Sequence, residues 1–151
     1  MSLKSTLAIP FAKKARKKVH KWAYNPHKTQ QKVFKELIKK AKNTAFGKDH
    51  NFDKITSYSD FKKQVKVTDY EGLRPYVDRI IAGENNVLWK GKPLYFAKTS
   101  GTTSGAKYIP ITRESMPTHI KAAKEALLFY IAEKNDASFV DGKMIFLQGS
   151  P

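Results

Sequence analysis

The sequence predicts an α/β fold, and three observations support that prediction. Two stretches near the beginning, residues 5–24 and 26–43, repeat their apolar residues at helical spacing. Short apolar runs bounded by Gly and Pro then predict strands at residues 87–89, 94–98, 107–112 and 143–149. A further helical pattern, ending near residue 133, separates the last two runs. A helical beginning followed by strands and another helix is typical of α/β architecture.

The first two helices are amphipathic. The first, over residues 5–24, is strongly basic, and its apolar face consists of Phe11, Ala15, Val19 and Trp22. The second begins where Asn25 can cap it and Pro26 can occupy its first position. Its buried stripe consists of Val33, Phe34, Leu37, Ile38 and Ala41. Gly47 is expected to act as the stop signal that follows it.

Two shorter helices are expected next. Ser57 and Asp60 have the spacing of a capping box, with Asp in place of the usual Glu, which predicts a short helix through Val65. Another helix is expected over about residues 75–82, with Gly83 as its C-terminal cap.

The last helix and the last strand point to an incomplete fold. Thr112 or Ser115 caps the helix, whose apolar face consists of Met116, Ile120, Ala123, Leu127, Tyr130 and Ile131. The strand after it, "KMIFLQG", reads as buried, and a buried strand needs neighbours on both edges. We therefore expect residues 1–25 to form a basic amphipathic helical arm. Residues 26–151 would be the incomplete N-terminal part of a larger domain whose C-terminal part is missing here.

Composition limits the classes to which the chain can belong. It has 151 residues, of which 40% are hydrophobic, enough for one packed core. Cys is absent and the four His residues are scattered, so neither a disulfide nor a metal site made of protein ligands is expected. No apolar run has the length of a membrane span. The short apolar run at the start precedes its cations, the reverse of a signal peptide, so we expect a cytoplasmic protein.

The positive charge is concentrated in the first part of the chain. The formal net charge is +16, and residues 1–66 contain 18 Lys or Arg against 4 Asp or Glu, whereas residues 67–151 contain 11 against 9. A uniformly basic nucleic-acid binder does not show this asymmetry. A basic arm does, which leaves open a nonenzymatic binding module for nucleic acid or anionic surfaces. The simpler interpretation is a solvated helix face whose Phe11, Val19 and Trp22 dock on the domain.

The stretch "TSGTTSGAK", residues 99–107, has the composition of a phosphate-binding loop. Gly101 and Gly105 permit backbone conformations in which amide N–H groups face an anion. Lys107 can place an ammonium near the same oxygens. Short hydroxyl donors come from Thr99, Ser100, Thr102, Thr103 and Ser104. A flexible turn is the alternative interpretation of the same composition.

The spacing within this loop excludes two common nucleotide-binding motifs. A Walker loop requires G-x-x-x-x-G-K followed by Ser or Thr, whereas here the order is G-x-x-x-G-x-K followed by Tyr108. A dinucleotide-binding loop opens a helix, whereas this loop opens a strand. The phosphate would therefore be held between two strands.

"TSGTTSGAK", entered from "YFAK" and left through "YIPIT", resembles the ATP-phosphate motif of the acyl-adenylate-forming superfamily. More narrowly, the longer stretch "NVLWKGKPLYFAKTSGTTSGAKYIPITRESM" resembles the auxin-responsive family of acyl-acid amido synthetases and its bacterial relatives. "FGKDHNF" and "YEGLRPYVDRI" fit the N-terminal region of that family, so the resemblance covers most of the chain from about residue 34.

The resemblance implies ATP-dependent adenylation of a carboxylic acid and transfer of the acyl group to an amine such as an amino acid, with Mg²⁺ bridging the phosphates. Residues 99–107 would bind the ATP phosphates through Ser100, Thr102 and Thr103 above all. No catalytic residue and no metal ligand is identified, because the family's later motifs are absent and this chain would be inactive alone. A pseudo-enzyme, or an interaction fragment of a split gene, is a third possibility.

Overall fold

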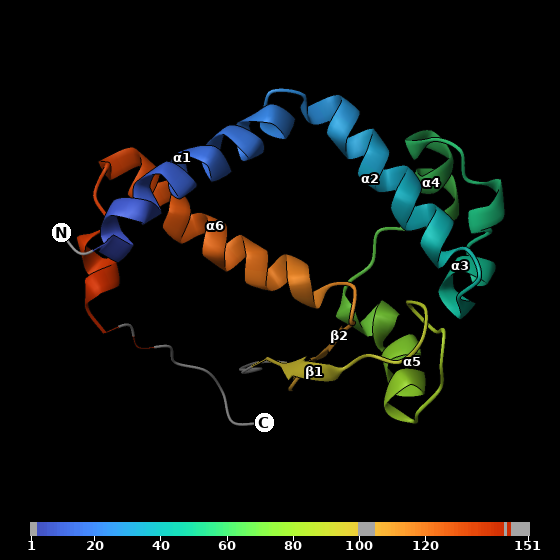
Figure 1. Ribbon diagram of the computed structural model, residues 1–151. Coiled ribbons are helices and arrows are strands. Elements are labelled where there is room, and N and C mark those ends of the chain that lie inside the picture. Colours follow the sequence, from blue (N-terminus) through green and yellow to red (C-terminus); the bar gives the residue numbers. More distant parts are fainter. Residues whose placement is uncertain (1–2, 100–104, 144, 146–151) are drawn as a thin grey trace. The chain divides into compact units, whose positions relative to one another are not determined.

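The computed structural model describes residues 3–99, 105–143 and 145 (Figure 1). The described elements are α1 (Leu3–Ala23), α2 (Pro26–Ala41), α3 (Ala45–Asp49), η1 (Phe52–Lys54), α4 (Tyr58–Gln64), α5 (Tyr70–Ile81), β1 (Tyr95–Lys98), β2 (Tyr108–Ile111), α6 (Met116–Lys134) and η2 (Ser138–Asp141). The two strands form one antiparallel pair. This is the α/β class that the sequence predicts. Among the described residues, no helix is both long and apolar enough to cross a membrane.

The chain divides into two compact units. The first unit comprises Met1–Pro26 and Thr118–Pro151, and the second comprises His27–Pro117. The predicted division into an arm over residues 1–25 and a domain over residues 26–151 stays a prediction.

The first unit is built on α1, η2 and most of α6. Figure 1 shows α1 in blue beside α6 in orange, and the fully buried Ala12 lies in one apolar cluster with Leu128, Ile131, Ala132 and Ala137. Arg16 Nη1 and Glu133 Oε2 form an ion pair at 3.0 Å across the same helices. The helix predicted over residues 5–24 is confirmed.

The apolar faces predicted for the two helices of this unit are corrected by the structure. Phe11 and Trp22 remain 52% and 50% exposed, because the contact with α6 is centred on Ala12. On α6 the buried residues are Leu128, Ile131 and Ala132. Exposed members of the predicted α6 face are Ile120, Leu127 and Tyr130. The prediction treated the whole helix as packed on one side, whereas its buried residues lie only near its C-terminal end.

The core of the second unit lies where α2 meets η1 and α4. Ile38, Ala41, Phe52 and Ile55 are its buried residues. Phe34 packs edge-on against Phe61, with ring centroids 5.7 Å apart. The predicted capping box is confirmed: Ser57 Oγ accepts from Asp60 N, and the Asp60 carboxylate accepts from Ser57 N at 2.9 Å.

Gly47 does not stop α2, so that prediction is wrong. The helix ends at Ala41, and Thr44 starts the short helix α3, which contains Gly47. The buried Thr44 hydroxyl donates to Ala41 O at 2.7 Å and accepts from Gly47 N at 3.0 Å. A Cβ on Gly47 would overlap the Ala41 carbonyl oxygen. Glycine is thus required here by the close approach of two backbone segments.

Helix α5 begins earlier than the predicted residue 75. Asp69 Oδ1 accepts from Gly72 N at 3.2 Å and caps the helix, and Pro75 lies inside it. The predicted end is confirmed, because Gly83 follows Ala82 with φ +93° and donates its N–H to Ile80 O at 3.0 Å.

Residues 87–89 form no strand, which corrects another prediction. Ala45 N donates to Asn86 O at 2.8 Å, and Phe46 N donates to Val87 O at 3.0 Å. These carbonyls therefore satisfy amides at the start of α3, where the first N–H groups lack partners within the helix. Val87 is 1% exposed, so its burial explains the apolar signal without a strand.

The strands predicted at residues 94–98 and 107–112 are confirmed as β1 and β2, which pair with each other. Their register pairs Tyr95 with Ile111, Phe96 with Pro110, and Lys98 with Tyr108. In the part of 143–149 that the structure describes there is no strand: Ile145 is 86% exposed and lies outside any element, and residues 144 and 146–149 lie outside the described residues.

Candidate phosphate-binding loop

The base of the candidate loop is closed by two hydrogen bonds just beyond the strand pair. Thr99 N donates to Lys107 O at 3.0 Å, and Lys107 N donates to Thr99 Oγ1 at 3.2 Å. In the second bond the acceptor is the Thr99 hydroxyl, whereas a regular antiparallel pair would use the Thr99 backbone carbonyl. Both ends of the loop are therefore fixed by residues that the sequence predicts as phosphate-binding.

Gly105 supplies the backbone freedom that the sequence predicts for it. Its φ is +80°, and no atom of the described residues lies within 4 Å of the position a Cβ would occupy. Side chains are disfavoured here by the backbone conformation and not by crowding. The other predicted residues, Ser100, Gly101, Thr102, Thr103 and Ser104, lie outside the described residues, and their role stays a prediction.

Lys107 lies at the exit of the loop, half-buried, with its ammonium over an aromatic ring. Its Nζ is 5.7 Å from the ring centroid of Tyr70, at the start of α5. Within residues 3–99, 105–143 and 145, no carboxylate lies within ion-pair distance of this ammonium. Its charge is therefore not neutralised by a described acidic side chain.

Tyr70 is the residue at this site that the sequence did not indicate. Its hydroxyl oxygen accepts a hydrogen bond from Tyr108 N at 2.9 Å, across 38 residues of chain. Arg74 also lies over its ring, 5.7 Å from the centroid, and is paired with Glu71 at 2.8 Å. No local pattern reports a contact of such sequence separation, so only the fold could reveal it.

The described part of the site suits an anion better than a metal ion. A hydroxyl, a glycine with positive φ and an unpaired ammonium are groups that bind phosphate oxygens. Mg²⁺ requires oxygen ligands such as carboxylates. Among the described residues, no group of three or more His, Cys, Asp or Glu is placed to hold a metal. The described groups at the base of the loop are thus of a kind that binds anions.

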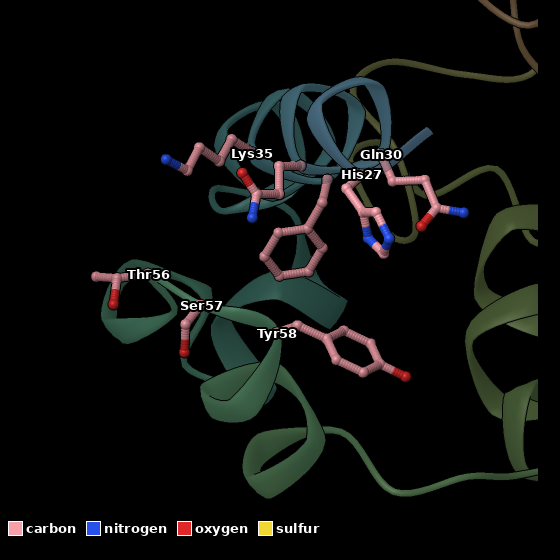
Figure 2. A pocket seen from close by; sticks show the side chains of 8 residues that line it. His27, Gln30, Lys35, Thr56, Ser57 and Tyr58 are labelled. Atoms are coloured by element: carbon pink, nitrogen blue, oxygen red, sulfur yellow. The ribbon is translucent and has the colours of Figure 1, made fainter. Parts of the chain in front are cut away.

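A separate pocket lies between the first turns of α2 and the start of α4 (Figure 2). Its volume is about 670 Å³, and it is lined by His27, Gln30, Gln31, Phe34, Lys35, Thr56, Ser57 and Tyr58. Thr56 and Ser57 already donate to the Asp60 carboxylate. The described loop residues Thr99, Gly105 and Lys107 do not line this pocket, so it forms no part of the loop.

Comparison with known proteins places these features in a family. Residues 15–149 match the GH3 family N-terminal domain. The chain is 31% identical over 105 residues to the indole-3-acetic acid-amido synthetase GH3.2 of Arabidopsis thaliana, a match covering 68% of this chain and 19% of that protein. It is 25% identical over 126 residues to the jasmonoyl--L-amino acid synthetase JAR4 of Nicotiana attenuata, covering 82% of this chain and 21% of that protein.

A shorter match has higher identity, 44% over 62 residues of the indole-3-acetic acid-amido synthetase GH3.15 of Arabidopsis thaliana, covering 40% of this chain and 10% of that protein. The chain spans about a fifth of the length of the first two relatives. Because the family match extends over most of the sequence and includes the hairpin and its loop, the chain belongs to the GH3 family.

Proposed function

We propose that this chain supplies the ATP-phosphate loop of an ATP-dependent acyl-acid amido synthetase. Three relatives are named as synthetases that join indole-3-acetic acid or a jasmonoyl group to an amine-containing partner. The observation that carries the proposal is the hairpin loop itself. Its base is closed by Thr99 and Lys107, and the Lys107 ammonium has no described acidic partner.

The proposed reaction has two steps. A carboxylate oxygen of the acid attacks the α-phosphorus of ATP, the bond to the β-phosphate oxygen breaks, and pyrophosphate leaves with the bonding electrons. The amine nitrogen of the acceptor, an amino acid, then attacks the acyl carbon, loses a proton, and displaces AMP to form the amide. Each step redistributes charge on phosphate oxygens, so fixed donors and cations near those oxygens lower the barrier.

The residues of this chain would act by binding and orientation. Ser100, Thr102 and Thr103 would donate hydroxyl hydrogen bonds to the phosphates, while Gly101 and Gly105 would let backbone amides face them. Lys107 would stabilise the charge on the departing pyrophosphate. Mg²⁺ would enter with ATP and would require ligands other than the described residues. We assign no general acid or base to this chain and propose that it has no activity alone.

The test is acid-dependent exchange of labelled pyrophosphate into ATP by the intact gene product. A double variant, Thr102→Ala with Thr103→Ala, should lower the exchange rate by about 10²-fold or more, since loss of one positioned donor to a developing oxyanion has an effect of that order. Thr118→Ala, on the exposed surface of α6, is the matched control and should retain the rate. An unchanged rate in the double variant would remove the loop from the reaction.

One observation favours a second candidate function, a binding module for nucleic acid or an anionic surface. The exposed residues of α1 include Lys13, Lys14, Lys17, Lys18 and Lys21. Binding through these cations would weaken steeply as salt rises. A gel-shift titration from low salt upward, with these five lysines replaced by Gln as control, tests it. No shift of duplex or single-stranded nucleic acid at low salt excludes nucleic acid as the partner.

A further inference from the structure

We infer that Tyr70 is a positioning residue of the phosphate loop, which fixes the first residue of β2 and holds the Lys107 ammonium beside the loop exit. This inference rests on the proposed function and extends it to α5, an element that the loop motif does not include. Two contacts of one side chain carry it. The Tyr70 hydroxyl accepts from Tyr108 N at 2.9 Å, and the Tyr70 ring lies 5.7 Å from Lys107 Nζ.

The hydroxyl contact fixes the backbone next to Lys107. Lys98 and Tyr108 are the last pair of the hairpin before the loop. The N–H of Tyr108 donates to the Tyr70 hydroxyl and not to β1. The end of the loop is therefore held by a residue of α5, which lies outside the hairpin. Without this acceptor, the amide of Tyr108 would lose its described partner, and the backbone of Lys107 would be held by Thr99 alone among the described contacts.

The ring contact holds the Lys107 ammonium without giving it an anionic partner. A carboxylate at this position would compete with phosphate for Lys107, whereas an aromatic face attracts a cation more weakly and adds no negative charge. Arg74 lies over the same ring, but Glu71 binds its guanidinium through Oε1 at 2.9 Å and Oε2 at 2.8 Å. Of the two cations on Tyr70, Lys107 is therefore the one available to a ligand.

The start of α5 gives Tyr70 a fixed position. Tyr70 is the first residue of the helix and directly follows Asp69, whose side chain caps it. A Cβ on Gly72 would overlap the Thr68 side chain, so this first turn is also closely packed. A side chain anchored on a capped helix can orient a loop residue better than another loop residue can.

The test uses Tyr70→Phe, which keeps the ring and removes the hydroxyl, and Tyr70→Leu, which removes both. In the intact gene product we expect the KM for ATP to rise about fivefold in Tyr70→Phe and more than tenfold in Tyr70→Leu, as losing a hydrogen bond and then a cation–π contact implies. Arg74→Gln should leave this KM unchanged. Tyr24→Leu, at an exposed tyrosine after α1, is the matched control.

Two further measurements separate positioning from a general loss of structure. If Tyr70 acts through Lys107, then Tyr70→Leu combined with Lys107→Met should raise the KM little beyond Lys107→Met alone. Amide hydrogen exchange should accelerate at Tyr108 in Tyr70→Phe while the rest of the second unit stays protected. This readout requires neither turnover nor the Leu variant to fold.

The outcomes distinguish this inference from the proposed function. If the wild-type gene product takes up no ATP in calorimetry with or without Mg²⁺, the proposed function falls and this inference with it. If the wild type binds ATP but Tyr70→Leu has an unchanged KM, or if Tyr108 exchange is the same in wild type and Tyr70→Phe, only the role of Tyr70 is overturned.

Discussion

The loops before and after β1 both contain small polar residues, but their hydrogen bonds serve different purposes. The loop before the strand is closed by Asn86 and Gly91: Asn86 N donates to Gly91 O at 3.1 Å, and Gly91 N donates to Asn86 Oδ1 at 2.8 Å. Its carbonyls at Asn86 and Val87 bind the start of α3. In the loop after the strand, the described polar contacts lie at its base, between Thr99 and Lys107.

The difference shows that small polar residues alone do not identify a binding loop. Around Asn86 the backbone groups hold one part of the fold to another, and the apolar Val87 is buried between them. Around Gly105, no atom from the part of the chain that the structure describes lies beside the backbone within 4 Å of a Cβ position. We therefore expect substitutions in the first region to lower stability and substitutions in the second to lower ATP affinity.

The largest effect is expected at Gly47, in the helix that binds the first loop. Gly47→Ala would force a methyl group against the Ala41 carbonyl, so we expect the free energy of unfolding of the second unit to fall by about 3 kcal/mol. Urea unfolding measures it. Lys48→Ala, at an exposed position of the same short helix α3, is the matched control and should retain the stability of the wild type. Equal stability of the two variants would contradict the close approach at Gly47.

Val87→Ala tests whether the first loop is part of the core. The side chain is 1% exposed, so its truncation should lower the free energy of unfolding by about 2 kcal/mol. Val67→Ala, at a fully exposed position, should change stability by less than about 0.5 kcal/mol. ATP affinity of folded protein should be the same in both variants. A Val87→Ala protein with reduced ATP affinity and normal stability would contradict the assignment of the first loop to the core.

Gly105→Ala tests the second loop. A side chain at φ +80° costs about 1–2 kcal/mol, and Gly105 is exposed, so its own backbone can change conformation to avoid that cost. We therefore expect an unchanged melting temperature and an ATP affinity reduced by about tenfold, measured by calorimetry. Gly105→Asn serves as the control, since Asn tolerates positive φ and should retain more of the affinity. A lower melting temperature with normal affinity would assign Gly105 to the fold.

The smallest effect is expected at Asp60, which lies outside both loops. Hydrogen bonds lower the pKa of this carboxyl group from 3.8 to about 2, and those from Thr56 contribute more than those from Ser57. The ionised carboxylate therefore stabilises the folded state at neutral pH. This contribution is complete above the unfolded pKa and disappears as pH falls from about 4 towards about 2.

Asp60→Asn should remove this part of the pH dependence. Between pH 7 and pH 2.5, the urea midpoint of the wild type should fall further than that of the variant. Glu114→Gln, at an exposed carboxylate, should follow the wild type. Parallel midpoints for wild type and Asp60→Asn would show that the capping box does not titrate in this range.

Local signals in the sequence predicted the elements whose causes are local. The capping box at Ser57 and Asp60 and the glycine after α5 each depend on residues a few positions apart. At the candidate loop, Thr99 and Lys107 bind each other at the base and Gly105 has a positive φ, while their role in phosphate binding stays a prediction.

The remaining features depend on contacts between distant parts of the chain. Val87 resembles a strand residue because it is apolar and buried, but its carbonyl oxygen accepts a hydrogen bond from an amide of α3 and not from a neighbouring strand. Gly47 resembles a helix stop, but glycine is required there because the Ala41 carbonyl oxygen lies too close to where a Cβ would be. Tyr70 carries no local mark of its contact with Tyr108, so the sequence alone could not include it in the site.

The pairing of Phe96 with Pro110 has a consequence for how the sheet can grow. In an antiparallel pair, N–H groups point alternately towards the partner strand and away from it. Because Thr99 and Lys107 exchange an inward bond, Tyr108 and Pro110 face outward. The Tyr108 amide is already bound to Tyr70, and proline has no N–H. This side of β2 therefore offers no free N–H donor within the strand to an incoming chain, which could bind only to the strand's carbonyl groups.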